Sequence, residues 1–154
     1  ADNDLILLEL IAYMETQPIA LLGPSELNPA LIRFKNQLNE NSARFARIGV
    51  YPEMNHNELL GWRTNVNNLA VVFFRNKCDY QRNNVRMDIN KGVISKYTEN
   101  ISEVWSKGFS LIENTLYLIN IGDWVSWYLS EMNSVDAIEI DVINFLKSEL
   151  AKIE

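Results

Sequence analysis

One six-residue run, LAVVFF at 69–74, constrains the fold of this chain more than any other stretch, because every residue in it is apolar. A strand that reads this way is usually covered on both faces, as in a parallel sheet flanked by helices. Further short apolar runs of strand type are PIALLG at 18–23 and FARIGV at 45–50, and Ile101–Trp105 reads as a last short strand. Together the four runs predict a sheet that is buried between layers of helices.

Helical patterns lie before and between the predicted strands. Apolar residues recur at helical spacing over Asn3–Glu15, which predicts an N-terminal helix. Asn28 and Pro29 suit a helix start, with Asn28 as the N-cap and Pro29 at the first helical position. The segment from Tyr80 to Lys91 is weakly helical and highly polar.

Two more helical segments complete the pattern. The stretch from Gly108 to about Asn133 is apolar nearly all round, which predicts a buried helix. Asp136–Lys152 is amphipathic, with one apolar stripe that includes Ile143 and Leu146. Helices that alternate with short apolar strands predict an α/β fold, a three-layer α-β-α sandwich with a mostly parallel sheet of the flavodoxin type. No repeat interrupts this order, so residues 1–154 are expected to form a single domain.

Charge and composition narrow the classes of function. The formal net charge of −6 argues against a nucleic-acid surface, since phosphate backbones bind basic faces. The most apolar long stretch, Phe109–Met132, contains Glu113 and Asp123 and is too polar to span a bilayer. The N-terminus lacks the basic region of a signal peptide, and Cys78 is the single cysteine, so no intrachain disulfide is expected. We expect a cytoplasmic protein.

Missing motifs exclude several families of nucleotide and metal enzymes. The sequence contains no Gly-x-Gly-x-x-Gly, no Gly-x-x-x-x-Gly-Lys-Ser/Thr, no His-Glu-x-x-His and no Gly-x-Ser-x-Gly. With one histidine and one cysteine, a zinc site would need carboxylates almost alone. We therefore expect neither a metal nor an organic cofactor, which leaves acid–base chemistry by His56, carboxylates and lysines.

Four segments resemble one known family, the bifunctional phosphoglucose/phosphomannose isomerases, which are built from sugar-isomerase (SIS) domains. The strongest match is YPEMNHNELLGW at 51–62, which resembles the family's Pro-Glu-Met-Asn-His-Asn-Glu…Gly-Trp signature. A second is RFKNQLNENSA at 33–43, which is similar to Lys-x-Gln-x-Asn-Glu-Asn-Ala. The others are LIENTLYLINIGDWVSWYL at 111–129 and INFLKSEL at 143–150, which resemble the Gly-Asp-Trp-Val-Ser helix and the C-terminal helix. The resemblance runs in order over nearly the whole chain, but it covers only the second of the family's two SIS halves.

This resemblance implies an aldose–ketose isomerase that interconverts glucose 6-phosphate, and mannose 6-phosphate, with fructose 6-phosphate through a cis-enediolate. It implies that Glu40 is the base that moves a proton between C1 and C2, and that His56 assists opening of the sugar ring. Lys147 would lie near the substrate hydroxyls, and Asn55 and Asn57 would orient or bind the substrate. In the family the histidine is contributed across a dimer, so a homodimer is expected.

The residues themselves leave plainer alternatives open. A lone histidine is most often an exposed or satisfied loop residue, although the run around His56 is too polar for a core position. Glu40 falls opposite the apolar stripe of its predicted helix, where a solvated carboxylate is ordinary. Lys147 lies at the border of an apolar stripe, from which most lysines extend to solvent. Phe145 lies on the opposite side of that helix, which favours a partner surface.

The resemblance covers only one of the family's two SIS halves, and this affects the function that can be expected. In the family the first half carries a Ser/Thr-rich loop that cradles the sugar phosphate, and no Ser-Gly-x-Thr-type loop occurs here. The chain would then be an excised C-terminal domain, or would need an N-terminal SIS half for activity. Two other functions stay open, a non-catalytic phosphosugar-binding module and a domain that serves only dimerisation. Retention of Glu40 and His56 together favours the enzyme, since a sensor needs no base.

Overall fold

A parallel sheet lies at the centre of the molecule. The computed structural model describes residues 7, 9–11, 14, 18–63 and 69–153. The four strands of this sheet pair in the order β2-β1-β3-β4, and all of their pairings are parallel. This confirms the predicted mostly parallel sheet, and each predicted apolar run overlaps a strand. The strands are β1 (Ile19–Pro24), β2 (Ala46–Tyr51), β3 (Ala70–Arg75) and β4 (Ile101–Trp105).

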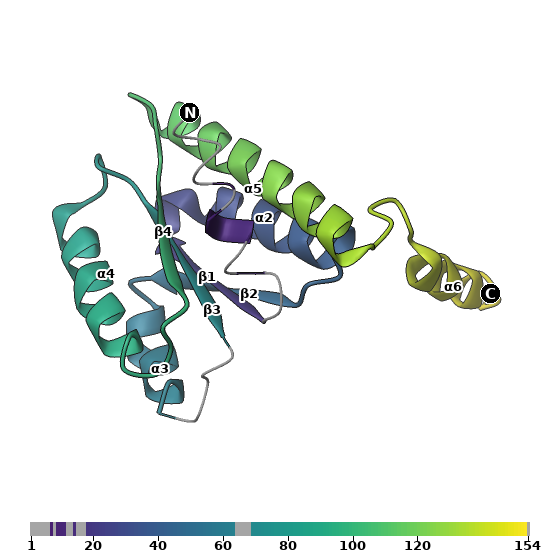
Figure 1. Cartoon of the computed structure of the whole chain (residues 1–154), viewed down its shortest axis with the longest axis horizontal. Coiled ribbons are helices and arrows are strands. Elements are labelled where there is room, and N and C mark those ends of the chain that lie inside the picture. The colour runs from purple at the N-terminus through teal and green to yellow at the C-terminus, as the bar shows by residue number, and fades with distance from the viewer. Residues whose placement is uncertain (1–6, 8, 12–13, 15–17, 64–68, 154) are drawn as a thin grey trace.

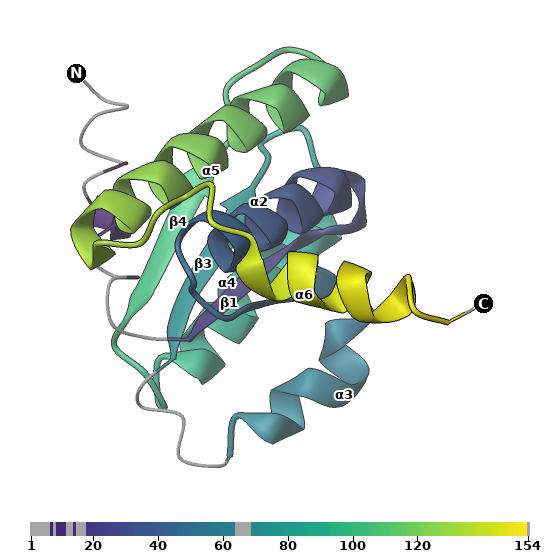
Figure 2. The same cartoon turned by 90° about the vertical axis from the view of Figure 1, so that its right-hand side faces the viewer.

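Helices cover both faces of the sheet (Figures 1 and 2). Two of them, α2 and α5, pack against each other on one face. Two others, α3 and α4, contribute to a separate core on the opposite face. A 3-10 turn, η1, leads into α2, and α6 follows α5. The bounds are η1 (Ser25–Leu27), α2 (Asn28–Asn41), α3 (Met54–Gly61), α4 (Gln81–Ile94), α5 (Leu111–Asn133) and α6 (Asp141–Leu150).

Successive side chains of β3 enter the two layers in turn, as the pleat of a strand requires. Val72 and Phe74 belong to the core under α2 and α5, whereas Val71 and Phe73 belong to the core under α3 and α4. Both faces of the strand are therefore buried, which explains why the run is apolar at every position. The predicted three-layer α-β-α sandwich is confirmed.

The start of α2 differs by one residue from the prediction. Its N-cap is Leu27 rather than Asn28, and no side chain of the described residues caps it. The cause is η1, which leads directly into α2 and places the fully buried Leu27 at the junction. The predicted helix Asn3–Glu15 lies largely outside the described residues.

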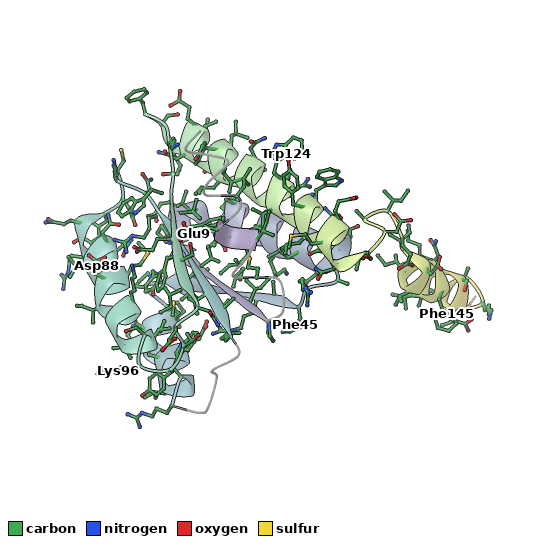
Figure 3. The ribbon with its side chains drawn as sticks, viewed as in Figure 1. Glu9, Phe45, Asp88, Lys96, Trp124 and Phe145 are labelled. Carbon is green, nitrogen blue, oxygen red and sulfur yellow. The ribbon has the colours of Figure 1, made fainter. Side chains whose placement is uncertain are left out.

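The prediction of a fully buried helix is wrong for the outer face of α5. Its inner face is buried, as at Val125 and Leu129, but Trp124 is 48% exposed and Trp127 is 43% exposed. Every residue of α6 is exposed, and this helix projects from the body of the molecule (Figure 1). Trp124 and Phe145 both extend away from the sheet (Figure 3). No element of the described chain covers these apolar faces, which is why the pattern alone overestimated their burial.

Candidate functional site

His56 lies on α3, just beyond the carboxyl end of β2. The structure thus places it on a helix rather than in a loop, and its side chain is exposed. Asn55 beside it is half-buried, and Asn57 is exposed and accepts a hydrogen bond from the backbone N–H of Glu58. In open α/β sheets, ligands bind outside the carboxyl ends of the strands, which is where this histidine lies.

Two polar contacts hold α3 against the body of the molecule. The Oδ1 atom of Asn55 accepts a hydrogen bond from Nδ2 of Asn90 on α4. One turn later, the carboxylate of Glu58 pairs with the guanidinium of Arg47 on β2. Residues 55 and 58 are three apart and share one helix face, so His56 between them is turned outward.

Glu40 lies at the C-terminal end of α2 and lines a hollow of about 200 Å³. Its side chain is exposed, as the helical pattern predicts. The hollow separates the end of α2 from the connection between α5 and α6 and from the start of α6. Its lining residues are Asn39, Glu40, Ala43, Val135, Asp136, Glu139, Ile140, Val142 and Ile143.

The end of α2 is fixed firmly to α5. Nδ2 of Asn41 donates to Oγ of Ser126 over 3.1 Å, and the guanidinium of Arg44 donates to Oδ1 of Asn133. Ala43 has a φ of 51°, in the left-handed region, where a residue other than glycine is strained. This conformation ends α2, and the N–H of Arg44 returns to the carbonyl of Leu38. Glu40 therefore sits on a rigid support.

Lys147 lies on α6, one helical turn beyond Ile143, which lines the hollow. Residues four apart share a helix face, so Lys147 lies on the Ile143 side of α6, near the hollow that Glu40 lines. Its side chain is exposed and is not among the lining residues. The structure brings the lysine into the neighbourhood of Glu40, not into contact with it.

Glu40 and His56 lie near opposite ends of the parallel strands, Glu40 near the amino ends and His56 near the carboxyl ends. The strands are parallel and α2 runs back from the carboxyl end of β1, so Glu40 is near the edge at which β2 begins. His56 follows the end of β2, which is six residues long. At about 3.3 Å per residue, the two edges are roughly 15–20 Å apart. In Figure 1, α3, which carries His56, and α6, which borders the hollow lined by Glu40, lie toward opposite ends of the long axis. One copy of the chain does not bring the two residues together.

A second hollow, of about 290 Å³, lies where the chain leaves β1 and β3 in opposite directions. This position is the usual ligand site of a doubly wound sheet. Here no lysine or arginine is among the lining residues, and two carboxylates are. The lining residues are Glu26, Asn76, Cys78, Asp79, Tyr80, Phe109, Ser110, Leu111 and Asn114.

A carboxylate of the chain itself lies at the N-terminus of α5 beside this second hollow, and another precedes the start of α4; helix N-termini are sites at which phosphates often bind. At α5, Oε2 of Glu113 accepts the N–H of Phe109 over 2.7 Å and that of Ser110 over 2.9 Å. The Phe109 N–H, with help from Ser110, lowers the pKa of Glu113 and keeps it anionic. At α4, Oδ1 of Asp79 accepts the N–H of Tyr80 over 2.7 Å. The second hollow is therefore unfavourable for a phosphate.

Two buried polar residues near the carboxyl edge escaped prediction. Arg75, at the end of β3, is 2% exposed, pairs with Asp88 and Glu103, and lies 4.7 Å from the ring centroid of Trp105. Asn90 is 3% exposed and binds Asn55. The polarity of residues 80–91 could have indicated buried polar side chains, because a helix this polar covers a sheet only if some of its polar side chains face the sheet.

The described residues contain no group of three or more histidine, cysteine, aspartate or glutamate side chains placed to hold a metal ion. Within the same residues, no helix combines the length and apolarity that a membrane crossing requires.

The strand order and the two covered faces define a doubly wound α/β domain. Residues 10–150 match the model of the bacterial phospho-glucose isomerase C-terminal SIS domain. The chain belongs to this family, which confirms the resemblance found in the sequence.

Relatives of known name agree with this assignment. The bifunctional phosphoglucose/phosphomannose isomerase of Aquifex aeolicus is 33% identical over 122 residues, which cover 78% of this chain and 38% of the relative. The enzyme of the same name from Caldicellulosiruptor bescii is 34% identical over 125 residues, covering 79% and 37%. The chain thus matches less than half the length of these relatives.

Solved structures show the same fold. A glucose-6-phosphate isomerase-like protein from Thermus thermophilus superposes with a TM-score of 0.64 at 15% identity, over 84% of this chain and 42% of that one. A hypothetical protein from the same organism superposes with a TM-score of 0.76 at 11% identity, over 96% and 43%. These identities are low, so the similarity supports the fold alone.

Proposed function

We propose that this chain is the base-supplying half of an aldose–ketose isomerase that interconverts glucose 6-phosphate, and mannose 6-phosphate, with fructose 6-phosphate. One observation carries the proposal: Glu40 lines a hollow at the rigid end of α2, with Lys147 one turn from the opposite wall. The names of the relatives supply the substrate class.

In the proposed mechanism, Glu40 removes the proton from the carbon next to the substrate carbonyl. The electrons of that C–H bond form the C1–C2 double bond of a cis-enediolate while the π electrons of the carbonyl move onto its oxygen. Glu40 then returns the proton to the former carbonyl carbon, and the hydroxyl proton on the carbon that Glu40 deprotonated moves to the former carbonyl oxygen, which leaves the new carbonyl. His56 transfers the proton that accompanies opening of the sugar ring, a task for which imidazole is suited because it gives and takes a proton near neutrality. Lys147 holds hydroxyls of the substrate, and Asn55 and Asn57 orient the ring-opening group.

The phosphate group needs a cradle that this chain does not provide among its described residues. The second hollow, beside the ends of β1 and β3, is lined by Glu26 and Asp79. Glu113 occupies the N-terminus of α5. We therefore assign phosphate binding to a second SIS half in the natural protein, an assignment supported by the length of the relatives. The isolated chain is expected to have negligible turnover, because remote binding energy holds the substrate for the chemical step.

The separation of Glu40 from His56 supports a site shared between two copies. If one reaction uses both residues, a second copy must present its His56 to the Glu40 of the first. A homodimer with two such sites satisfies this requirement and obeys two-fold symmetry.

The test uses Glu40→Gln and His56→Ala in the natural full-length protein. Glu40→Gln keeps the shape and removes the base, so turnover should fall at least about 10²-fold with substrate affinity nearly intact. Exchange of the C2 proton with deuterated solvent should fall with it. Near-normal proton exchange in Glu40→Gln would show that the base is elsewhere.

Mixing the two variants tests the shared site. A mixed dimer restores one site with an intact Glu40 and an intact His56, so random exchange of subunits should recover about a quarter of the wild-type activity. A mixture that stays as inactive as its components would show that both residues act from the same copy. Normal turnover by His56→Ala alone would show that His56 has no role. Binding of fructose 6-phosphate without turnover by the wild-type protein would favour a phosphosugar sensor instead.

A further inference from the structure

Helix α3, which carries His56, is weakly held by its own sequence. It has eight residues, and no side chain of the described residues caps its N-terminus. Met54 is its single buried residue. A helix this short is marginal by itself, so its position depends on contacts with the rest of the molecule.

Asn90 supplies one of those contacts from the interior. It lies on α4, is 3% exposed, and its Nδ2 donates to Oδ1 of Asn55, the residue before His56. Tyr51, at the end of β2, is fully buried beside the same amide. Burial raises the pKa of Tyr51, and the Asn90 amide acts in the opposite direction. Asn90 therefore joins the first turn of α3 to the middle of α4.

The geometry around Asn55 explains how this contact acts on His56. The first turn of α3 is fixed by Met54 in the core and by Asn55 on Asn90, and the second turn by Glu58 on Arg47. These three positions share one side of the helix, and His56 is turned outward. Loss of the Asn90 contact removes one of the two contacts that fix the turn carrying the imidazole, and it leaves Met54 and the second turn attached.

We infer that Asn90 is a positioning residue for His56, acting through Asn55. This inference rests on the proposed function for its kinetic consequence, but its structural consequence is measurable without any activity. Asn90 touches neither the substrate nor the reacting atoms, and it sets where the imidazole stands when the second copy brings its own Glu40 to the site.

A matched control lies on the same helix. Asn83 is also buried, at 6% exposure, and lies two turns earlier on α4. Its amide donates to Asp79 over 3.2 Å and accepts from Arg86 over 3.3 Å, so it is equally engaged but has no hydrogen bond to the described residues of α3. Asn83→Ala should destabilise the fold about as much as Asn90→Ala, without freeing the first turn of α3.

The first arm of the experiment is hydrogen exchange of the α3 amides, residues 58–61, in the 154-residue chain. Asn90→Ala should speed their exchange about 3- to 10-fold, the effect of losing one net hydrogen bond in a locally opening segment. Asn83→Ala should leave it unchanged. In the Asn55→Ala background, Asn90→Ala should add no further increase, because the two residues act through one contact. Unchanged exchange in Asn90→Ala, or an equal rise in Asn83→Ala, would refute the inference.

The second arm is kinetic and uses the natural full-length protein. Asn90→Ala should lower kcat/KM for the cyclic substrate about 10-fold, and that for an open-chain analogue less than about 3-fold, because ring opening is the step that needs a positioned His56. Equal losses on both substrates, or none, would overturn the positioning role even if exchange rises. Normal turnover in Glu40→Gln would instead refute the proposed function and leave the exchange result standing.

Discussion

Gly122 on α5 offers a quantitative test of how α2 and α5 are packed. A Cβ atom added there would lie 2.8 Å from Cγ and Cδ2 of Phe34 on α2. The Phe34 ring cannot retreat freely, because it is stacked on Phe74 of β3 with centroids 5.8 Å apart and an interplanar angle of 9°. Ordinary carbon–carbon contacts need about 3.5–4.0 Å, so α2 or the ring must shift by more than about half an ångström.

Two opposed terms set the magnitude for Gly122→Ala. Alanine in a helix interior is favoured over glycine by about 1 kcal/mol. Overpacking of a close-packed core typically costs about 1–3 kcal/mol. The net effect should be a loss of about 1 kcal/mol, which lowers the Tm of a chain of this length by about 2–4 °C. Urea unfolding followed by circular dichroism measures it.

Gly92 provides the matched control. It lies on α4, and a Cβ atom there would meet nothing within 4 Å. Gly92→Ala should therefore raise stability by about 0.5 kcal/mol, since the propensity term acts alone near the end of the helix. In a Phe34→Leu background the loss caused by Gly122→Ala should shrink or reverse. If Gly122→Ala stabilises as much as Gly92→Ala, the close approach of α2 and α5 is not real, and the support inferred for Glu40 fails with it.

Two further predictions concern charged groups. Arg75→Ala should lower the free energy of unfolding in urea by about 2–3 kcal/mol, somewhat less than the loss of a fully buried pair, because Lys91 still neutralises Glu103. Lys152→Ala removes an exposed ion pair and should lower the free energy of unfolding by under about 0.5 kcal/mol. Equal losses in the two variants would contradict the importance of burial. The pKa of Glu113 is lowered from its ordinary value of 4.5 by the Phe109 N–H and Ser110, so its stabilising effect is complete above pH 4.5 and is lost as the pH falls through the lower folded value. The stability difference between wild type and Glu113→Gln should therefore shrink below pH 4.5, and a difference that does not vary with pH would count against this capping role.

The sheet could be predicted from the sequence because its strands obey a simple rule. A strand covered on both faces is apolar throughout, and the run at 69–74 has the length and the Val and Phe content of such a strand. The exposed outer face of α5 could not be predicted in the same way. The segment that holds Trp124 and Trp127 was predicted to be a buried helix, because an apolar pattern indicates that residues are covered without indicating whether this chain supplies the cover.

The candidate site, too, could be predicted only in part. His56, Asn55 and Glu40 were found through local motifs, and their places on α3 and α2 follow from the chain order. Asn90 was missed, because its role depends on a contact between residues 35 positions apart that no local pattern encodes. Arg75 was missed for a related reason, since a charged residue at the end of an apolar run usually marks the point where a strand reaches solvent.

The separation of Glu40 from His56 follows from the fold itself rather than from detail that a side chain could adjust. In a βαβ unit the helix returns from the carboxyl edge to the amino edge, so the end of α2 and the start of α3 must lie one strand length apart. That length, roughly 15–20 Å, exceeds what rotamer changes in a glutamate and a histidine can span. If, as proposed, one reaction uses both groups at one substrate, a second copy of the chain must supply one of them. On this reasoning, a variant that abolishes association should lose ring-opening assistance while keeping Glu40 and its support at α5 intact.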